Sequence, residues 1–474
     1  MLKRLFLFLL VSFIFLLIGE ARAANFTVNN NTDTFDAAAG NGVCADAIGD
    51  CTLRAAVDEA NALAGNDTIN FAASLMNATI TLTTGNQITV NGAGGTLQIN
   101  GLGANKLTID GGAGSNRIFF TVGAATLTIS GLTMQNGGAI GIGPDGGAIF
   151  ATGGTLVLNA VHIQNNNAGA NNGGGVHFSG GTNHRILNST ISNNSSANGG
   201  GFYLDNGGTL FMANSTISGN TITGQGGGIL LANSTATFRN STITNNTANA
   251  IVGGIESFSS SFNMGNTIIA GNIAPNFPDI GNFNGTTSAG NNFIGDSPGD
   301  SSATINPIAY QPTDIQNQNP MLGILQNNGG PTPTHAFLMP SLAVNTGDNA
   351  KAVNPFDNSA LTSDQRGFSP RMVGTVDIGA FEFNAAPPTA ASVSIGGQVL
   401  TANGNAVRKA RVVLTAPNGQ IRTAITNPFG YYRFDDVEVG ASYVFNVVSK
   451  RYSFAPQVVS VVEDLTELNF IAEP

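Results

Sequence analysis

A pattern of apolar and polar positions recurs about every 26 residues through the middle of the chain. Isoleucine returns at Ile191, Ile217, Ile243 and Ile269. Within one such unit, Phe202 and Leu204 share one face of a short run, Leu210 and Met212 form a second run, and Ile217 belongs to a third. Three short strands with no helix between them exclude a βαβ unit and predict one coil of a parallel β-helix.

Asparagine and glycine mark the corners of the same unit. Asparagine recurs at the interval of 26 in two series, Asn188, Asn214, Asn240, Asn266 and Asn194, Asn220, Asn246, Asn272. Glycine pairs open the units at 146, 173, 199, 226 and 253. Asparagine tolerates the left-handed backbone of a bend, and identical side chains stacked on successive coils can bond to one another. We therefore predict structural asparagine ladders rather than catalytic asparagines.

The register also predicts which side chains face outward. The inward series are Ile149, Val176, Phe202, Ile229, Ile255 and Ile186, Met212, Phe238, Met264. The outward neighbours of the first series are Phe150, His177, Tyr203, Leu230 and Glu256. This partly aromatic stripe is the candidate ligand-binding surface, because aromatic faces can stack on sugar rings; the alternative is that the rings only reflect strand propensity. A hydroxyl array on the third strands (Thr190/Ser192, Thr216/Ser218, Thr242/Thr244) would suit ice binding, but Ile268 and Ala270 interrupt it.

Charged residues are too sparse in the repeats to predict a catalytic site. Residues 146–272 contain only Arg185, Asp205, Arg239 and Glu256. Asp205 and Glu256 would lie roughly 12 Å apart, beyond the ~5 Å and ~6.5–9.5 Å separations of glycosidase carboxylates. The histidines His162, His177 and His184 fall in different columns without an evident carboxylate partner. We predict no catalytic residues, metal or cofactor. The loop acids Asp145, Asp279 and Asp296 could still complete a catalytic site, so the alternative of an enzyme stays open.

The N-terminus has the pattern of a secretory signal peptide. Lys3 and Arg4 precede an apolar run from Leu5 to Ile18, and Ala21-Arg22-Ala23 forms a small-x-small cleavage site. The run is shorter than the ~20 residues of a transmembrane helix, and no second apolar run follows. We expect export to the extracellular space or cell surface, with no transmembrane segment in the mature chain.

Cys44 and Cys51 are the two cysteines of the chain. In an oxidising compartment they predict a disulfide; metal binding is the weaker alternative, because no histidine lies near. The segment that follows has helical apolar spacing at Leu53, Ala56, Val57 and Ala60. Cys-Thr-Leu-Arg followed by Glu-Ala-Asn resembles the CSLREA domain of secreted bacterial β-helix proteins, over about residues 24–82. Ala55 departs from that motif, which usually has Glu at this position.

Beyond residue 300 the repeat fades into a different set of motifs. These are Asn319–Gly323 (NPMLG), Asn327–His335 (NNGGPTPTH), Asp364–Gly367 (DQRG) and Asp377–Glu382 (DIGAFE). Together they resemble the choice-of-anchor Q domain, a C-terminal region of surface β-helix proteins, over residues 305–384. We expect Asp364, Arg366, Asp377 and Glu382 to form turn bonds and ion pairs that cap the open end of the coil, an edge that must be covered.

The last part of the chain differs in composition. A proline-containing linker at 385–391 precedes alternating runs that predict a small antiparallel β-sandwich over 392–474. Gly397-Gln398-Val399, Ala410–Leu414 and Thr426–Phe434 resemble the carboxypeptidase regulatory-like domain, of transthyretin-like, carbohydrate-binding-like topology. That family is an accessory module, and no His-Glu-x-x-His zinc motif accompanies it.

These patterns predict an all-β protein, a pectate-lyase-like right-handed parallel β-helix over 83–304 with one short N-terminal helix and a C-terminal sandwich. The net charge is −10, and the sequence contains no cluster of basic residues. This excludes a nucleic-acid partner. We expect a monomeric, exported, non-catalytic protein of adhesion or polysaccharide binding, with a polysaccharide or cell-surface glycan as partner. The alternative is a polysaccharide lyase or glycoside hydrolase of the pectin-degrading β-helix type.

Overall fold

The computed structural model describes residues 23–472 except 92–94, 113–115, 125, 139–144, 283–285, 297–307, 370–373, 384–391, 417–420, 439–440 and 462–464. The predicted signal segment, apart from Ala23, and the predicted linker therefore lie outside the described residues. The chain divides into two compact units, residues 1–387 and 388–474, which we treat separately. No helix in the described ranges is long and apolar enough to cross a membrane.

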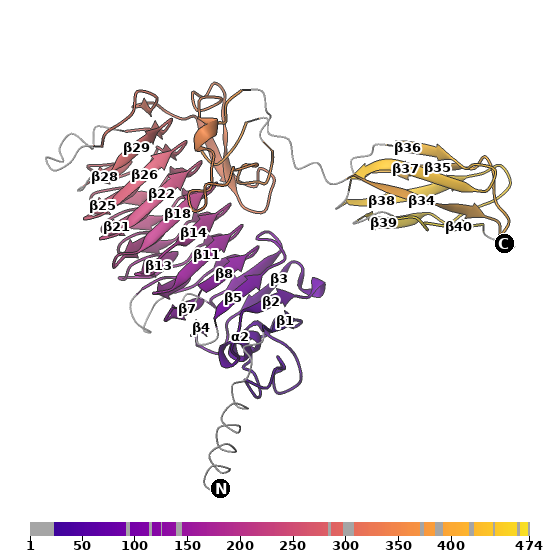
Figure 1. Cartoon of the computed structure of the whole chain (residues 1–474), viewed down its shortest axis with the longest axis horizontal. Coiled ribbons are helices and arrows are strands. Elements are labelled where there is room, and N and C mark those ends of the chain that lie inside the picture. Colours follow the sequence, from indigo (N-terminus) through magenta and orange to yellow (C-terminus); the bar gives the residue numbers. More distant parts are fainter. Residues whose placement is uncertain are drawn as a thin grey trace, which may run out of the picture. The chain divides into compact units, whose positions relative to one another are not determined.

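The first unit is a right-handed parallel β-helix of about eight coils, as predicted (Figure 1). Three parallel sheets run along it. Sheet A comprises β1 (Asn25–Val28), β2 (Asp67–Phe71), β5 (Thr96–Asn100), β8 (Thr126–Ser130), β11 (Thr155–Asn159), β14 (His184–Leu187), β18 (Thr209–Ala213), β22 (Thr235–Arg239), β26 (Ser261–Gly265) and β29 (Thr287–Gly290). Sheet B comprises β3 (Ala78–Thr81), β6 (Leu107–Asp110), β9 (Thr133–Gln135), β12 (His162–Gln164), β15 (Thr190–Ser192), β19 (Thr216–Ser218), β23 (Thr242–Thr244), β27 (Ile268–Ile269), β30 (Phe293–Ile294) and β31 (Ile315–Gln316).

Sheet C completes each coil. It comprises β4 (Ile88–Val90), β7 (Phe119–Val122), β10 (Ile149–Thr152), β13 (Val176–Ser179), β17 (Phe202–Asp205), β21 (Ile229–Ala232), β25 (Ile255–Phe258) and β28 (Ile280–Asn282). A short sheet at one corner contains β16 (Ser195–Ser196), β20 (Thr221–Ile222) and β24 (Thr247–Ala248). The inward columns are fully buried and in the register that the period predicts, for example Ile191, Ile217 and Ile243.

One asparagine series forms a continuous buried ladder. Asn194, Asn220 and Asn246 each donate from Nδ2 to the Oδ1 of the asparagine one coil ahead, at 2.9–3.0 Å. Asn272, the last of the series, donates instead to Oδ1 of Asp279 at 2.8 Å. Every amide in the row both donates and accepts a hydrogen bond. The last group of the row only has to accept one, and a carboxylate, which has acceptor oxygens and no donor, can do this. Asp279 is thus explained as the terminus of the ladder.

The other asparagine series occupies the corners between sheets A and B. Asn188, Asn214, Asn240 and Asn266 all have φ between 44° and 50°. This left-handed conformation is one that asparagine tolerates better than most residues. Their side chains make longer bonds to one another, such as 3.5 Å between Asn214 and Asn188. The main function of this series is therefore to turn the backbone.

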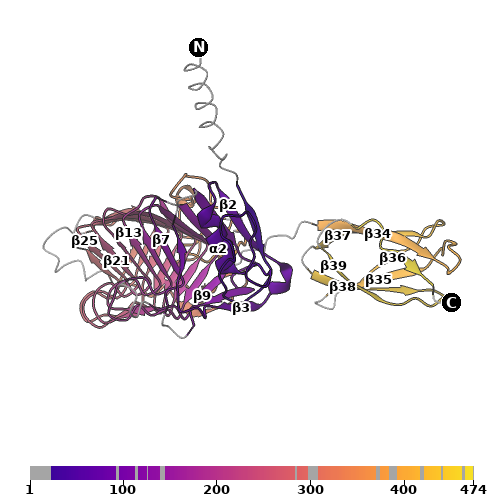
Figure 2. The same cartoon turned by 90° about the horizontal axis from the view of Figure 1, so that it is seen from below.

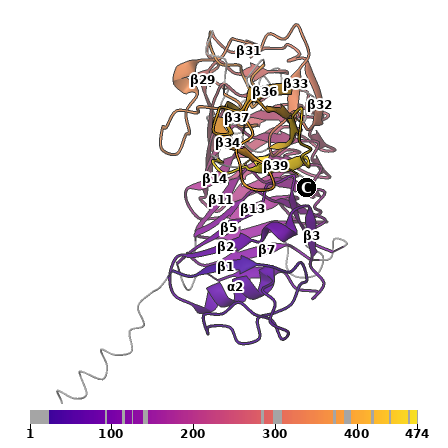
Figure 3. The same ribbon diagram turned by 90° about the vertical axis from the view of Figure 1, so that its right-hand side faces the viewer.

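An N-terminal layer covers the first coil. Helix α2 (Leu53–Ala62) lies across the end of the solenoid beside β1 (Figure 3) and buries Leu53, Ala56 and Val57 in the common core. The buried Arg54 pairs with Asp33 at 2.6 Å, which anchors the helix to the loop before it. Cys44 and Cys51 form a disulfide, which confirms that prediction. The segment thus closes the apolar end of the coil.

The segment after the last coil runs back along the solenoid, and the expectation that it caps the open end was wrong for most of its length. This return segment (residues 317–383) includes β32 (Leu322–Gln326), β33 (Thr334–Phe337) and the 3-10 helix η3 (Asn349–Lys351). It lies beside the upper coils in Figure 1 and covers sheet B. Ile268 and Phe293 of that sheet pack with Phe337 and Phe381 of the return segment. The apolar residues that interrupt the hydroxyl array are thus the reason the segment docks there.

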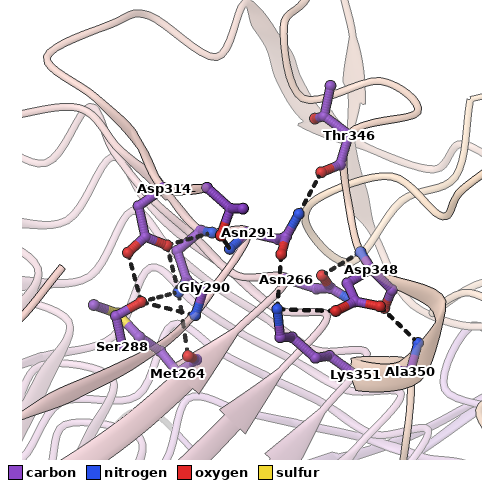
Figure 4. A network of polar contacts seen from close by, with 12 residues as sticks. Met264, Asn266, Ser288, Gly290, Asn291, Asp314, Thr346, Asp348, Ala350 and Lys351 are labelled. Atoms are coloured by element: carbon purple, nitrogen blue, oxygen red, sulfur yellow. Dashed lines mark hydrogen bonds and ion pairs between the residues drawn. The ribbon is translucent and has the colours of Figure 1, made fainter. Parts of the chain in front are cut away.

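Polar contacts fix the return segment coil by coil. Asn266 and Asp348 exchange two hydrogen bonds, and Asn291 bonds to both Thr346 and Lys351 (Figure 4). The hydroxyl array that the sequence placed at the surface is buried by these contacts. Its partners on the return segment are Pro333 for Thr190, Gln365 for Thr190 and Thr216, His335 for Ser218, and Ala380 for Thr242. This array on sheet B is therefore covered and is not available as an ice-binding face.

The acids of the return segment serve its own turns. Asp364 and Arg366 form a buried ion pair at 2.6 Å, and Arg366 also donates to the backbone oxygen of Glu382. Glu382 accepts from the backbone N–H of Asp377 at 3.1 Å. Burial, together with the charge of Asp377, raises the pKa of Glu382 to about 8. These residues hold the segment in shape on the side of the coil.

The second unit is a small sandwich of two sheets (Figure 2). One sheet contains β37 (Tyr431–Glu438), β34 (Ser392–Leu400) and β40 (Phe470–Ile471) in that order. The other contains β36 (Ile421–Ile425), β35 (Arg411–Thr415), β38 (Ala441–Val448) and β39 (Gln457–Val461). Their facing sides bury a core that includes Val412, Phe434 and Phe445. All pairings are antiparallel except β34 with β40.

Candidate ligand site on sheet C

The outward stripe predicted from the sequence lies in register on sheet C. Strand pairing places Phe150 beside His177, His177 beside Tyr203, Tyr203 beside Leu230 and Leu230 beside Glu256. Phe120 of β7 precedes Phe150 in the same column, which the sequence analysis did not include. Its ring centroid is 5.6 Å from that of Phe150. Four rings therefore follow one another along the axis, one on each coil.

The rings stack on each other. The Phe150 and His177 centroids are 4.9 Å apart with an interplanar angle of 25°, and those of His177 and Tyr203 are 4.7 Å apart at 36°. These distances match the ~4.8 Å spacing of neighbouring strands, because the rings occupy the same position on successive parallel strands. We refer to Phe120, Phe150, His177 and Tyr203 as the ring column.

Only part of the stripe reaches the surface, which corrects the expectation of five exposed side chains. Phe120, Phe150 and Tyr203 are half-buried, whereas His177 is 3% exposed, Leu230 5% and Glu256 0%. The glycine turn before each strand folds over the outward residue. A Cβ on Gly226 would lie 2.9 Å from the Cβ of Leu230. The sequence showed the glycines, but the path of their turns depends on the three-dimensional corner.

Two aspartates flank the imidazole of His177, which overturns the expectation that it lacks a carboxylate partner. Asp145 Oδ2 lies 3.3 Å from Nδ1, and Asp205 Oδ2 lies 3.2 Å from Nε2. Burial alone would lower the pKa of His177, but the two carboxylates outweigh it and raise that pKa. The three side chains come from three successive coils. The two carboxylates therefore favour the protonated form of the imidazole.

Arg117 extends this alternation of charge. Its guanidinium lies 5.7 Å from the ring centroid of Phe120 and 5.1 Å from that of Phe150, and its Nε donates to the backbone oxygen of Gly146. Burial lowers the pKa of Arg117 to about 10, and the charge of Asp145 opposes that shift. Basic and acidic side chains thus alternate from Arg117 to Asp205 beside the rings. Arg117 was missed because it precedes the repeats in which charges were counted.

The ring column combines half-exposed rings with acidic side chains. Both nitrogens of His177 face carboxylates and its ring is buried, so the ring surface open to a ligand belongs to Phe120, Phe150 and Tyr203. Half-exposed rings beside carboxylates offer the stacking faces and hydrogen-bond acceptors that a sugar polymer can use. In the part of the chain that the structure describes, no three His, Cys, Asp or Glu side chains are arranged so that they could hold a metal ion together.

The remaining histidines of the repeats have structural partners. His162 Nε2 lies 2.9 Å from the hydroxyl of Ser192, and burial lowers the pKa of His162 to about 4. His184 Nδ1 accepts from the backbone N–H of Leu156 at 3.0 Å. Both are neutral imidazoles at pH 7, because burial lowers their pKa. Of the loop acids, Asp279 ends the asparagine ladder and accepts from the backbone N–H of Asp296.

We expect Glu256 to make the stability of the solenoid depend on pH. Neither side-chain oxygen makes a well-aligned hydrogen bond, although the backbone N–H of Gly226 faces the carboxyl, and burial raises the pKa of Glu256 to about 7. Between its unfolded pKa near 4.5 and about 7, the folded state binds more protons than the unfolded state, so the free energy of unfolding falls as pH rises. We expect Glu256→Gln to gain about 1–3 kcal/mol over wild type between pH 5 and pH 8.

Urea unfolding at both pH values measures this difference. The exposed Glu467 provides the control, because Glu467→Gln should follow wild type at both. A Glu256→Gln protein whose stability relative to wild type is the same at pH 5 and pH 8 would contradict a buried ionisable carboxyl.

Comparison with known proteins agrees with both folds. Residues 116–297 match the family described as "Right handed beta helix region", and residues 394–471 match "Carboxypeptidase regulatory-like domain". No curated protein matches the chain. Among solved structures, the crystal structure of pectate lyase Pel9A aligns with a TM-score of 0.42 and 13% identity, over 77% of this chain and 97% of that chain. A likeness of this degree carries no conclusion about activity.

Proposed function

We propose that this protein is an exported, non-catalytic β-helix protein that binds an extended polysaccharide along sheet C, in adhesion or at a cell surface. The observation that carries the proposal is the ring column, in which Phe120, Phe150 and Tyr203 remain half-exposed. A disulfide and the lack of a membrane-spanning helix in the described residues are compatible with an extracellular location.

The spacing of the column favours a polymer over a small ligand. Phe150 and Tyr203 are two coils apart, about 9.6 Å along the axis, with the buried His177 between them. A sugar unit is similar in length to one coil spacing, so alternate residues of an extended glycan could stack on these two rings. The charges beside them alternate and cancel, so the interaction should depend weakly on salt.

We expect Tyr203→Ala to weaken polysaccharide binding by about 1–2 kcal/mol, because it removes one ring of the column. A glycan array probed with the mature protein identifies the ligand, and titration with that ligand measures the loss. Phe258→Ala is the matched control, since Phe258 is 55% exposed at the other end of a sheet C strand. If no glycan is retained, or if both variants bind like wild type, the ring column is not a binding surface.

A polysaccharide lyase or glycoside hydrolase is the second candidate, because Asp145, His177 and Asp205 bring acid and base groups together. Reducing-end and unsaturated-product assays on the bound glycan test it. We expect no product. Product formation that His177→Gln abolishes in a folded protein would establish catalysis in place of simple binding.

A further inference from the structure

The C-terminal sandwich contains a groove of about 720 Å³ between β34, β36 and β37. This volume is within the ~300–1,000 Å³ range of small-molecule sites. Gly396 and Gly397 line it, so part of its wall is bare backbone. A Cβ on Gly397 would lie 2.0 Å from the backbone oxygen of Leu468, which leaves no room for a side chain. Glycine is therefore required at this position of the wall, where the backbone of Leu468 approaches closely.

An exposed aromatic ring lines this groove. Tyr431 is 53% exposed, and Ile425, another lining residue, is 69% exposed. The side-chain oxygen of Asn427 accepts from the backbone N–H groups of Phe429 at 2.9 Å and of Tyr431 at 3.0 Å. These bonds fix the backbone from which the ring of Tyr431 projects. A tyrosine side chain has only two side-chain torsions, so it loses little conformational entropy when a ligand stacks on it.

Polar groups line the rest of the groove. They include the hydroxyls of Ser394, Thr423 and Thr466 and the guanidinium of Arg433. Asp435 and Ser394 hold that guanidinium at 2.5 and 2.7 Å, so its charge is balanced and its direction is set. The groove thus pairs a stacking face with hydroxyl and guanidinium groups and has no uncompensated charge to favour an ionic ligand.

We propose that this groove binds a short neutral oligosaccharide, with one sugar ring stacked on Tyr431. A polypeptide strand is the less favoured occupant, because Arg422 of β36 already reaches across to the backbone oxygens of Asp435 and Asp436 of β37. The proposal is independent of sheet C, because the groove belongs wholly to residues 394–466. Two glycan sites on one chain would raise its avidity for a polysaccharide.

The test uses the full mature chain carrying Tyr203→Ala, which weakens any contribution of the ring column and is kept the same in every variant compared. Immobilised neutral oligosaccharides of about three to six units, built from glucose, xylose, mannose or N-acetylglucosamine, are the probes. We expect retention of at least one of them, and a loss of about fivefold or more in affinity when Tyr431→Ala is added. Tyr452→Ala is the control, because Tyr452 is 41% exposed and does not line the groove.

The possible outcomes separate the two sites. Binding that depends on Tyr431 but not on Tyr203 supports the groove and leaves the sheet C proposal to its own test. Loss of all glycan binding in the Tyr203→Ala background, with Tyr431 intact, overturns the groove proposal. Peptides retained through Tyr431 on a synthetic peptide array, with no glycan retained, would replace the oligosaccharide by a polypeptide strand.

Discussion

Ile217→Asp is expected to unfold the solenoid. Ile217 is 0% exposed and lies in the sheet B column between Ile191 and Ile243. A carboxylate there would have apolar neighbours on both adjacent coils and no cation to pair with. Burying an unpaired charge costs several kcal/mol, so we expect a loss of about 4 kcal/mol or more in the free energy of unfolding.

Circular dichroism during urea or thermal unfolding measures this loss. Thr235→Asp is the control, because Thr235 is exposed on the outer face of sheet A, and the same charge in water should cost less than about 1 kcal/mol. If Ile217→Asp yields a soluble protein with unchanged melting, the inward column has been assigned incorrectly.

The second large effect is expected from breaking the asparagine ladder with Asn220→Leu. Asn220 is 0% exposed; its Oδ1 accepts from the backbone N–H and from Nδ2 of Asn194, and its Nδ2 donates to Asn246 and to the backbone oxygen of Ile191. Leucine has a similar volume but leaves two donors and one carbonyl buried without partners. Since each costs about 1–3 kcal/mol, we expect a total loss of about 3–5 kcal/mol.

Asn167→Ala is the matched control for the ladder. Asn167 is exposed and adjoins Asn166, which extends the ladder by donating from Nδ2 to Oδ1 of Asn194 at 2.9 Å. The side chain of Asn167 accepts from the nearby backbone N–H of Gly169. Its loss should cost less than about 1 kcal/mol. Equal unfolding midpoints for Asn220→Leu and Asn167→Ala would show that neighbouring backbone or water satisfies the ladder groups.

Together the two predictions separate the sources of stability in the solenoid. The isoleucine column supplies apolar burial that any coil of this shape needs. The asparagine ladder supplies hydrogen bonds whose partners are fixed at one register, so a slip of a strand would break several at once. The ladder therefore specifies the register as well as stabilising it.

The sequence by itself determined the repeating part of this protein. A coil length near 26 residues places identical positions one above another, so the inward columns such as Ile191, Ile217 and Ile243 follow from the period alone. The disulfide and the N-terminal helix also followed from local pattern, because close sequence spacing limits where their residues can lie.

Contacts between segments that follow no period were decided only by the tertiary structure. Asp145, which precedes strand β10, contacts His177 on strand β13. The glycine turns bury Leu230 and Glu256 by folding over them. The return segment packs on sheet B because Ile268 and Phe293 present apolar surface there. These two residues lie many positions before Phe337 and Phe381, which pack against them. Alternation along a strand gives the face on which a side chain lies. Whether that face is exposed to solvent depends on whether a distant segment packs its apolar side chains against it.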